Sequence, residues 1–181
     1  TGNDLETLCR MAVDRLIREV FEQEGPCMSA IAFVSGQRRK EVSAMFPDGT
    51  GGRRLTGDGT IAIEPSWGGQ AGQLVYTLYR DHHSETVLLD VVNRRKRRLA
   101  VQQGLNSGAA LSPDGRLLAV CRSENGRVDL VLQSLVEETS RLLTSDAAVE
   151  ASPAWSPDGR RLCFVSDRGG IPRVYTSSRG G

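Results

Sequence analysis

The chain has 181 residues, 39% of them hydrophobic and 25% charged, which suffices for one domain with a core and excludes a disordered chain. Lys and Arg number 23 against 22 Asp and Glu, so the formal net charge of +1 gives no reason to expect nucleic acid or an anionic membrane as a partner. No run reaches the roughly 18 apolar residues of a membrane span, and the N-terminus lacks the basic-then-apolar order of a signal peptide. We therefore expect no membrane insertion.

The first predicted element is an amphipathic helix within residues 1–26. Its apolar side chains recur with the helical period, at Leu5, Leu8, Ala12, Leu16, Val20 and Phe21. Asn3 with Glu6 resembles a capping box, and Gly25 with Pro26 is typical of a helix end. A single apolar stripe has to pack against another surface, so we interpret residues 1–26 as a packing helix.

From residue 31 onwards the chain repeats short strand patterns at a fixed interval. SPDGR occurs at 112–116 and again 44 positions later, at 156–160. Leucines follow the same register, at Leu74, Leu118 and Leu162 and at Leu55, Leu99 and Leu143. In each SPDG turn the proline presets φ and the glycine adopts the left-handed conformation, which predicts a tight hairpin. A period of roughly 40 to 50 residues with several short strands per unit is typical of the blades of a β-propeller.

We therefore predict an all-β fold, a partial β-propeller of about four blades that follows one amphipathic α-helix. The predicted blades span residues 31–59, 60–103, 104–147 and 148–181, and a complete blade has strands A to D from the inside outwards. The first blade lacks strand A and the last lacks strand D. Two blade faces then have no neighbour, so we expect self-association through these open faces.

Two stretches of the repeats resemble a known family. SPAWSPDGRRLCFVSDRGGIPRVY at 152–175 and LSPDGRLLAVCRSENGRVDL at 111–130 resemble the blades of the TolB family, the periplasmic propeller proteins of the Tol-Pal system. IAFVS at 31–35, which follows a helix, is also similar to this family, in which a small α/β domain ends in a helix and leads into a six-bladed propeller. The resemblance implies a periplasmic location, and it makes residues 1–26 the end of an α/β domain.

Residues that could carry catalysis or bind metal all have a structural explanation. The four cysteines, Cys9, Cys27, Cys121 and Cys163, form no C-x-x-C pair, and we expect buried free thiols at the last two. The serines and aspartates of SPDG serve the turn, and no G-x-S-x-G elbow occurs. His82 and His83 have no further ligands committed to a metal. The sequence predicts no enzyme, no metal and no cofactor.

Two basic runs were considered as a nucleic-acid surface. NRRKRRL at 93–99 falls on a C-to-D hairpin, whereas QRRK at 37–40 falls on a B-to-C connection. These turns lie at opposite ends of a propeller, so the two runs do not join into one track. We interpret them as solvated turns, with docking to an acidic protein as the alternative, and expect no nucleic-acid partner.

The remaining candidate site is the mouth of the propeller channel. The starts of strands A and the B-to-C loops lie at the same end, where propellers commonly bind partners. The candidate partner-binding residues there are Glu64, Asp81, His82, Asn106, Glu124, Asn125, Glu150, Asp167 and Arg168. The resemblance implies a Pal-like lipoprotein as the partner.

The sequence thus favours a non-catalytic protein-binding scaffold of the bacterial cell envelope. The alternative is the substrate-gating propeller of a prolyl-oligopeptidase-like serine peptidase whose catalytic domain lies outside the chain. Carbohydrate binding is disfavoured because Trp67 and Trp155 stand at core positions of the repeat.

Overall fold

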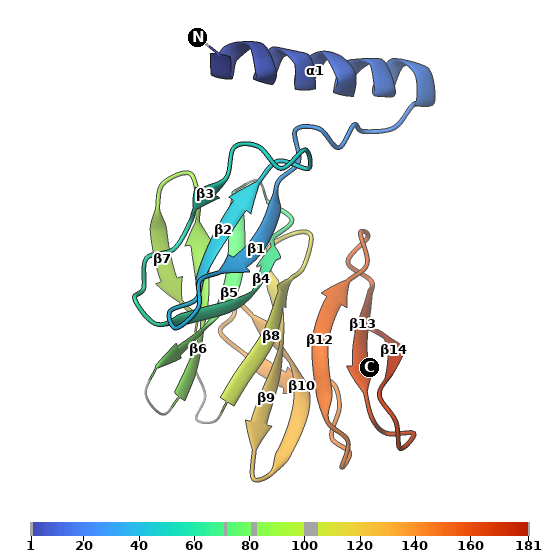
Figure 1. The fold of residues 1–181 in the computed structure, drawn as a ribbon. Helices are drawn as coiled ribbons and strands as arrows, with labels where there is room; N and C mark the ends of the chain where they lie inside the picture. Colours follow the sequence, from blue (N-terminus) through green and yellow to red (C-terminus); the bar gives the residue numbers. More distant parts are fainter. Residues whose placement is uncertain (1, 71, 81–82, 100–104, 181) are drawn as a thin grey trace.

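A computed structural model describes residues 2–70, 72–80, 83–99 and 105–180, with side chains from residue 5 in the first range and from residue 107 in the last. Within these ranges one helix precedes four antiparallel sheets. The sheets lie side by side, and the helix stands apart from them at one end of the molecule (Figure 1).

Each sheet is one blade. Blade 1 contains β1 (Ile31–Ser35), β2 (Glu41–Met45) and β3 (Arg53–Arg54). Blade 2 contains β4 (Ile61–Trp67), β5 (Gln73–Arg80), β6 (His83–Asp90) and β7 (Arg95–Arg98). Blade 3 contains β8 (Leu105–Leu111), β9 (Leu117–Glu124), β10 (Arg127–Ser134) and β11 (Ser140–Leu142). Blade 4 contains β12 (Glu150–Trp155), β13 (Arg161–Ser166) and β14 (Arg173–Ser178).

This arrangement confirms the predicted fold class. Strands pair antiparallel with their chain neighbours in every blade, and in the described ranges blade 1 has no strand A and blade 4 no strand D. The basic run 93–99, predicted as the C-to-D hairpin of blade 2, contains the outer strand of that blade from Arg95 to Arg98. Arginine and lysine fit this strand because its side chains are all exposed at the rim of the blade.

The repeated SPDG turns adopt the predicted geometry. Gly115 and Gly159 have φ of 69° and 66°, and the N–H of Gly159 donates to the carbonyl of Ser156 at 2.9 Å. Asp158 accepts from the backbone N–H of Arg160 at 3.0 Å. A hydrogen bond from the Ser156 hydroxyl, followed by this one, lowers the pKa of Asp158. The turn aspartates therefore hold the hairpins, as the sequence predicted.

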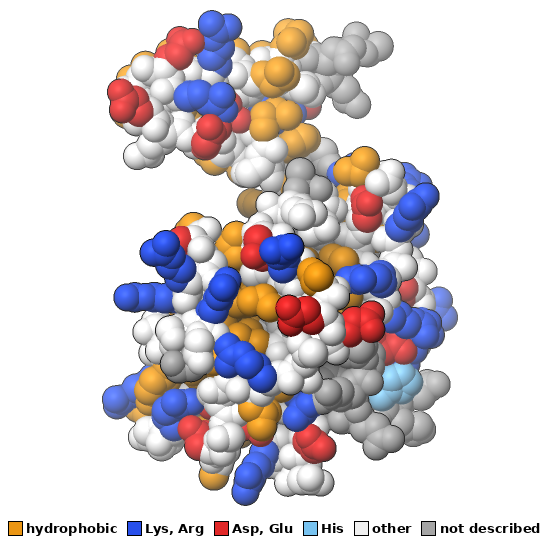
Figure 2. All heavy atoms as spheres, turned by 180° about the vertical axis from the view of Figure 1, so that it is seen from behind, with side chains coloured by type: hydrophobic (Ala, Val, Ile, Leu, Met, Phe, Trp, Pro, Cys, Tyr) orange, Lys and Arg blue, Asp and Glu red, His pale blue; other side chains and the backbone are white. Residues whose placement is uncertain are grey.

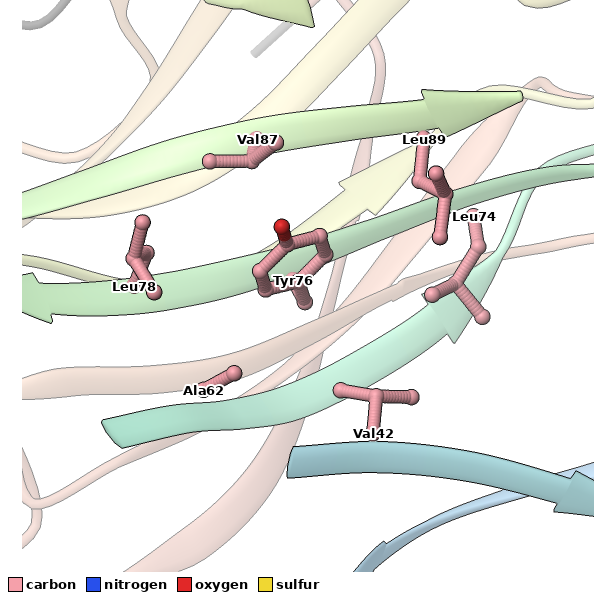
Figure 3. Packing of buried hydrophobic residues seen from close by; sticks show 7 residues of the cluster. All are labelled: Val42, Ala62, Leu74, Tyr76, Leu78, Val87 and Leu89. Atoms are coloured by element: carbon pink, nitrogen blue, oxygen red, sulfur yellow. The ribbon is translucent and has the colours of Figure 1, made fainter. Parts of the chain in front are cut away.

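The hydrophobic core lies between the blades rather than within one sheet. Between blades 1 and 2 the buried side chains are Val42, Ala62, Leu74, Tyr76, Leu78, Val87 and Leu89, which point toward one another across the two sheets (Figure 3). Similar clusters fill the spaces between blades 2 and 3 and between blades 3 and 4. Alternate residues of a strand face opposite sides of its sheet, so each blade contributes to two clusters.

The face that a blade turns to the next blade along the chain is called its forward face. Thr86, Leu130 and Val174 occupy the same register position on the forward faces of blades 2, 3 and 4. Their exposed fractions are 4%, 0% and 72%. The forward face of blade 4 is therefore uncovered among the described residues.

Helix α1 (Gly2–Phe21) confirms the predicted helix but ends before Gly25. Glu22 terminates it in the left-handed conformation, with φ of 54° and a hydrogen bond from its N–H to the carbonyl of Arg18. Figure 2 shows a gap between part of the helix and the blades, with hydrophobic side chains exposed along the helix. No helix in the described residues has the length and hydropathy needed to cross a membrane.

Candidate functional site

The mouth is the end of the propeller formed by the B-to-C turns and the starts of the innermost strands. Backbone contacts join neighbouring blades there, because Lys40 forms a parallel bridge with Ile61 and Val128 forms one with Val149. The N–H of Val149 also donates to Asp167 at 2.8 Å. The candidate loops and strand starts are thus held together by short links between blades.

A β-bulge recurs on the innermost strand of blades 2, 3 and 4. The strand register breaks at this point in each blade, and the first bulge residue has a positive φ: 54° at Glu64, 55° at Gly108 and 51° at Ser152. A positive φ strains a residue with a side chain and is accepted readily by glycine. The sequence prediction missed these bulges, although the three residues share one place in the repeat.

Glu64 uses its bulge to connect two blades. Its carboxylate accepts a hydrogen bond from the backbone N–H of Gly108 in blade 3 at 2.7 Å, and from the hydroxyl of Thr77 in its own blade at 3.1 Å. The carboxylate of Glu64, a candidate partner-binding residue, is therefore engaged within the protein.

The sequence predicted that the Glu150 side chain points to the channel opening, but the structure places it elsewhere. It is 1% exposed, and it accepts from Arg168 at 2.8 Å and from the Ser166 hydroxyl at 3.3 Å. Burial raises the pKa of Glu150, and the arginine opposes that effect. Glu150 pairs with Ser166 in the strand register, so both side chains lie on the face of blade 4 that packs against blade 3. Glu150 is held within blade 4 and is not accessible at the mouth.

Arg168 is also tied into blade 4. Its guanidinium lies 5.4 Å from the ring centroid of Phe164 and 5.0 Å from that of Tyr175, and 3.4 Å from Asp146. The hydrogen bond to Glu150 raises the pKa of Arg168 further. About one third of this side chain, 33%, stays exposed, so it adds positive charge to the mouth surface.

The other candidates divide into accessible residues and residues that cannot be placed. Glu124 is 57% exposed beside Arg122, and Asn125 forms the exposed B-to-C turn of blade 3 with φ of 51°. Asp81 and His82 lie outside the described residues, as does the side chain of Asn106. The accessible part of the mouth is therefore centred on the turn of blade 3.

The described residues contain no group of three or more His, Cys, Asp or Glu side chains able to hold a metal ion. Cys121 and Cys163 are free thiols that lie on the forward faces of blades 3 and 4. The chemistry available at the mouth is hydrogen bonding and charge.

Four antiparallel sheets packed face to face, with repeated SPDG turns and repeated inner-strand bulges, define a β-propeller segment. A family model described as the TolB beta propeller domain matches residues 18–181. The chain belongs to the TolB β-propeller family, which confirms the resemblance seen in the sequence.

Individual relatives agree with this assignment. The Tol-Pal system protein TolB of Desulfosudis oleivorans is 31% identical over 128 residues, which cover 68% of this chain and 29% of that protein. TolB from Acinetobacter baumannii superposes with a TM-score of 0.84 at 22% identity, over 95% of this chain and 44% of the other. A TolB structure from Agrobacterium tumefaciens gives 0.76 at 20% identity, over 87% and 59%. The chain thus spans less than two thirds of each relative.

Proposed function

We propose that the chain is a non-catalytic protein-binding propeller of the Tol-Pal system in the bacterial periplasm, and that its mouth binds a Pal-like lipoprotein. The observation that carries the proposal is the match of the TolB propeller model to residues 18–181. The exposed polar turn of blade 3 supports the mouth as the binding surface, because Glu124 and Asn125 are accessible there. The gating propeller of a peptidase is the less supported alternative, because the family match is to TolB.

Binding of the soluble domain of a Pal lipoprotein to the immobilised chain tests this proposal. We expect Glu124→Arg to weaken binding by about tenfold, because a reversed charge at the interface opposes a partner selected for the original one. Glu137→Arg makes the same charge change on an exposed C-to-D turn of blade 3, at the opposite end, and serves as the control. No binding by the unaltered chain, or equal loss in both variants, would contradict the proposal.

The proposal includes self-association through the open blade faces. Val174 on the forward face of blade 4 is 72% exposed, and Ile171 in the adjoining B-to-C turn is 57% exposed. A second copy that covers them would give a mass that rises with protein concentration in light scattering. A constant monomer mass would contradict this part.

A further inference from the structure

We infer that the bulge at Ser152 binds a side-chain carboxylate of the protein partner. The carboxylate would enter the space between Gly108 and Ser152, called the notch, which is open because residue 108 has no side chain. The inference deepens the proposed function, on which it rests, by naming the chemical group that the mouth recognises.

The equivalent bulge in blade 3 already binds a carboxylate. The Glu64 side chain reaches from blade 2 to the backbone N–H of Gly108, at 2.7 Å. The Glu64 carboxylate therefore occupies, in blade 3, the position that we infer for the ligand carboxylate in blade 4. It shows how a carboxylate can accept a hydrogen bond from the N–H of a bulge residue. Hydrogen bonds of this charge-assisted kind are shorter and stronger than neutral ones.

The bulge in blade 4 offers the same donor. Ser152 lies in the break of the strand register between Ala151 and Ala154, and its φ of 51° matches the 55° of Gly108. The same bulge geometry directs the Ser152 N–H toward blade 3, as it directs the Gly108 N–H toward blade 2. Ser152 is exposed.

Glycine at position 108 leaves this donor open. Gly108 stands where blade 2 has Glu64, so blade 3 supplies no carboxylate at this position. A Cβ atom built on Gly108 would lie 3.1 Å from the backbone nitrogen of Ser152. The Cβ atom of any other residue at position 108 would therefore occupy the notch. Because glycine has no Cβ atom, a group from another molecule can enter it.

The second contact of the ligand would be weaker than that of Glu64. The hydroxyl of Thr77 donates to Glu64, and Cys121 occupies the place of Thr77 in blade 3. A thiol is a poor donor compared with a hydroxyl, so we expect the isolated notch to bind a free carboxylate weakly. A partner protein adds the rest of its interface.

Amide resonances of the ¹⁵N-labelled chain test the inference directly. N-acetyl-L-glutamate is titrated as the probe, and N-acetyl-L-glutamine, which has the same shape without charge, is the control probe. We expect the glutamate to shift the Ser152 amide proton downfield and saturably, with at most a small effect of the glutamine. An unchanged Ser152 amide, or equal shifts with both probes, would overturn the inference.

Two matched variants locate the effect. Gly108→Glu places in blade 3 the residue that blade 2 carries at the same φ, and we expect the Ser152 amide to be shifted without probe and to stop responding. Gly49→Glu adds the same charge at a positive-φ glycine in the C-to-D connection of blade 1, at the opposite end of the propeller, where a built Cβ meets nothing within 4 Å, and should respond as the unaltered chain does. A response that persists in folded Gly108→Glu would contradict the notch. If that variant does not fold, the two probes on the unaltered chain decide.

The outcome separates this inference from the proposed function. Partner binding without a response to glutamate would overturn the notch alone. A glutamate response without partner binding would leave the carboxylate site and overturn its assignment to a Pal-like partner.

Discussion

Trp67 and Trp155 occupy the same repeat position in blades 2 and 4 but differ in one hydrogen bond. The indole N–H of Trp155 donates to the carbonyl of Ala110 in blade 3 at 3.1 Å. The indole nitrogen of Trp67 is enclosed and has no hydrogen-bond partner among the residues that the structure describes. Ala110 belongs to an innermost strand, and blade 1 has no such strand in the described residues, so Trp67 lacks the corresponding acceptor.

Because of this difference, replacing each tryptophan by phenylalanine should change the free energy of unfolding by a different amount. Trp155→Phe should lower the free energy of unfolding by about 1 kcal/mol more than Trp67→Phe, since only the first removes a hydrogen bond and the second removes an unsatisfied donor. Urea unfolding of both variants measures the difference, and each variant is the packing control for the other. A Trp67→Phe variant that is equally or more destabilised would contradict the assignment.

At the scale of elements, helix α1 is attached to blade 1 through a few polar contacts. Arg10 is 8% exposed, lies 4.2 Å from the ring centroid of Phe46 and donates to Asp48 at 2.9 Å. Asp14 accepts from the backbone N–H groups of Cys27 and Met28, each at 2.8 Å. The apolar side of the helix contributes little, because Leu8 and Leu16 are 61% and 59% exposed.

The helix attachment should therefore depend on the charge of Asp48. Hydrogen bonds from Thr50 and then Arg10 lower the pKa of Asp48 to about 2. A lowered folded-state pKa means that the contact is complete above the ordinary aspartate pKa of about 3.9 and is lost as the pH falls through about 2. Hydrogen exchange of residues 22–30 should accelerate over that range when it is expressed relative to the intrinsic exchange rate, because the intrinsic rate itself slows as the pH falls.

Asp48→Asn should produce the same acceleration at neutral pH. Asp90→Asn is the matched control, because Asp90 also accepts backbone hydrogen bonds in a turn, but its partners Val92 and Asn93 lie in the C-to-D turn of blade 2. Equal exchange in the two variants would contradict the attachment through Asp48.

The sequence predicted the features that follow from local patterns and missed those that depend on contacts between distant residues. The leucine register and the SPDG turns fixed the blade count and the missing strands, because each is a local pattern with a known turn or strand geometry. The inner-strand bulge and the burial of Glu150 depend on contacts between residues far apart in the chain. Glu64 and Gly108 show how far the sequence can predict the site. Their equivalent positions in the repeat can be seen in the sequence, whereas the hydrogen bond between them cannot.

At the scale of the whole molecule, each blade from the second onwards covers the forward face of the preceding one. Leu130 and Val174 show the consequence, since the same register position is fully buried in blade 3 and mostly exposed in blade 4. The two blade cysteines extend the comparison. Cys121 is 0% exposed between blades 3 and 4, and Cys163 lies on the open forward face of blade 4.

The reactivity of these two thiols in one dilute sample is the most direct test. Burial raises the pKa of the Cys121 thiol to about 12, so its thiolate is scarce as well as covered. With iodoacetamide at mildly alkaline pH and peptide-resolved mass spectrometry, we predict that Cys163 reacts at least about 100-fold faster than Cys121. Equal rates, or a faster Cys121, would contradict the packing of blade 4 on blade 3 and with it the propeller arrangement.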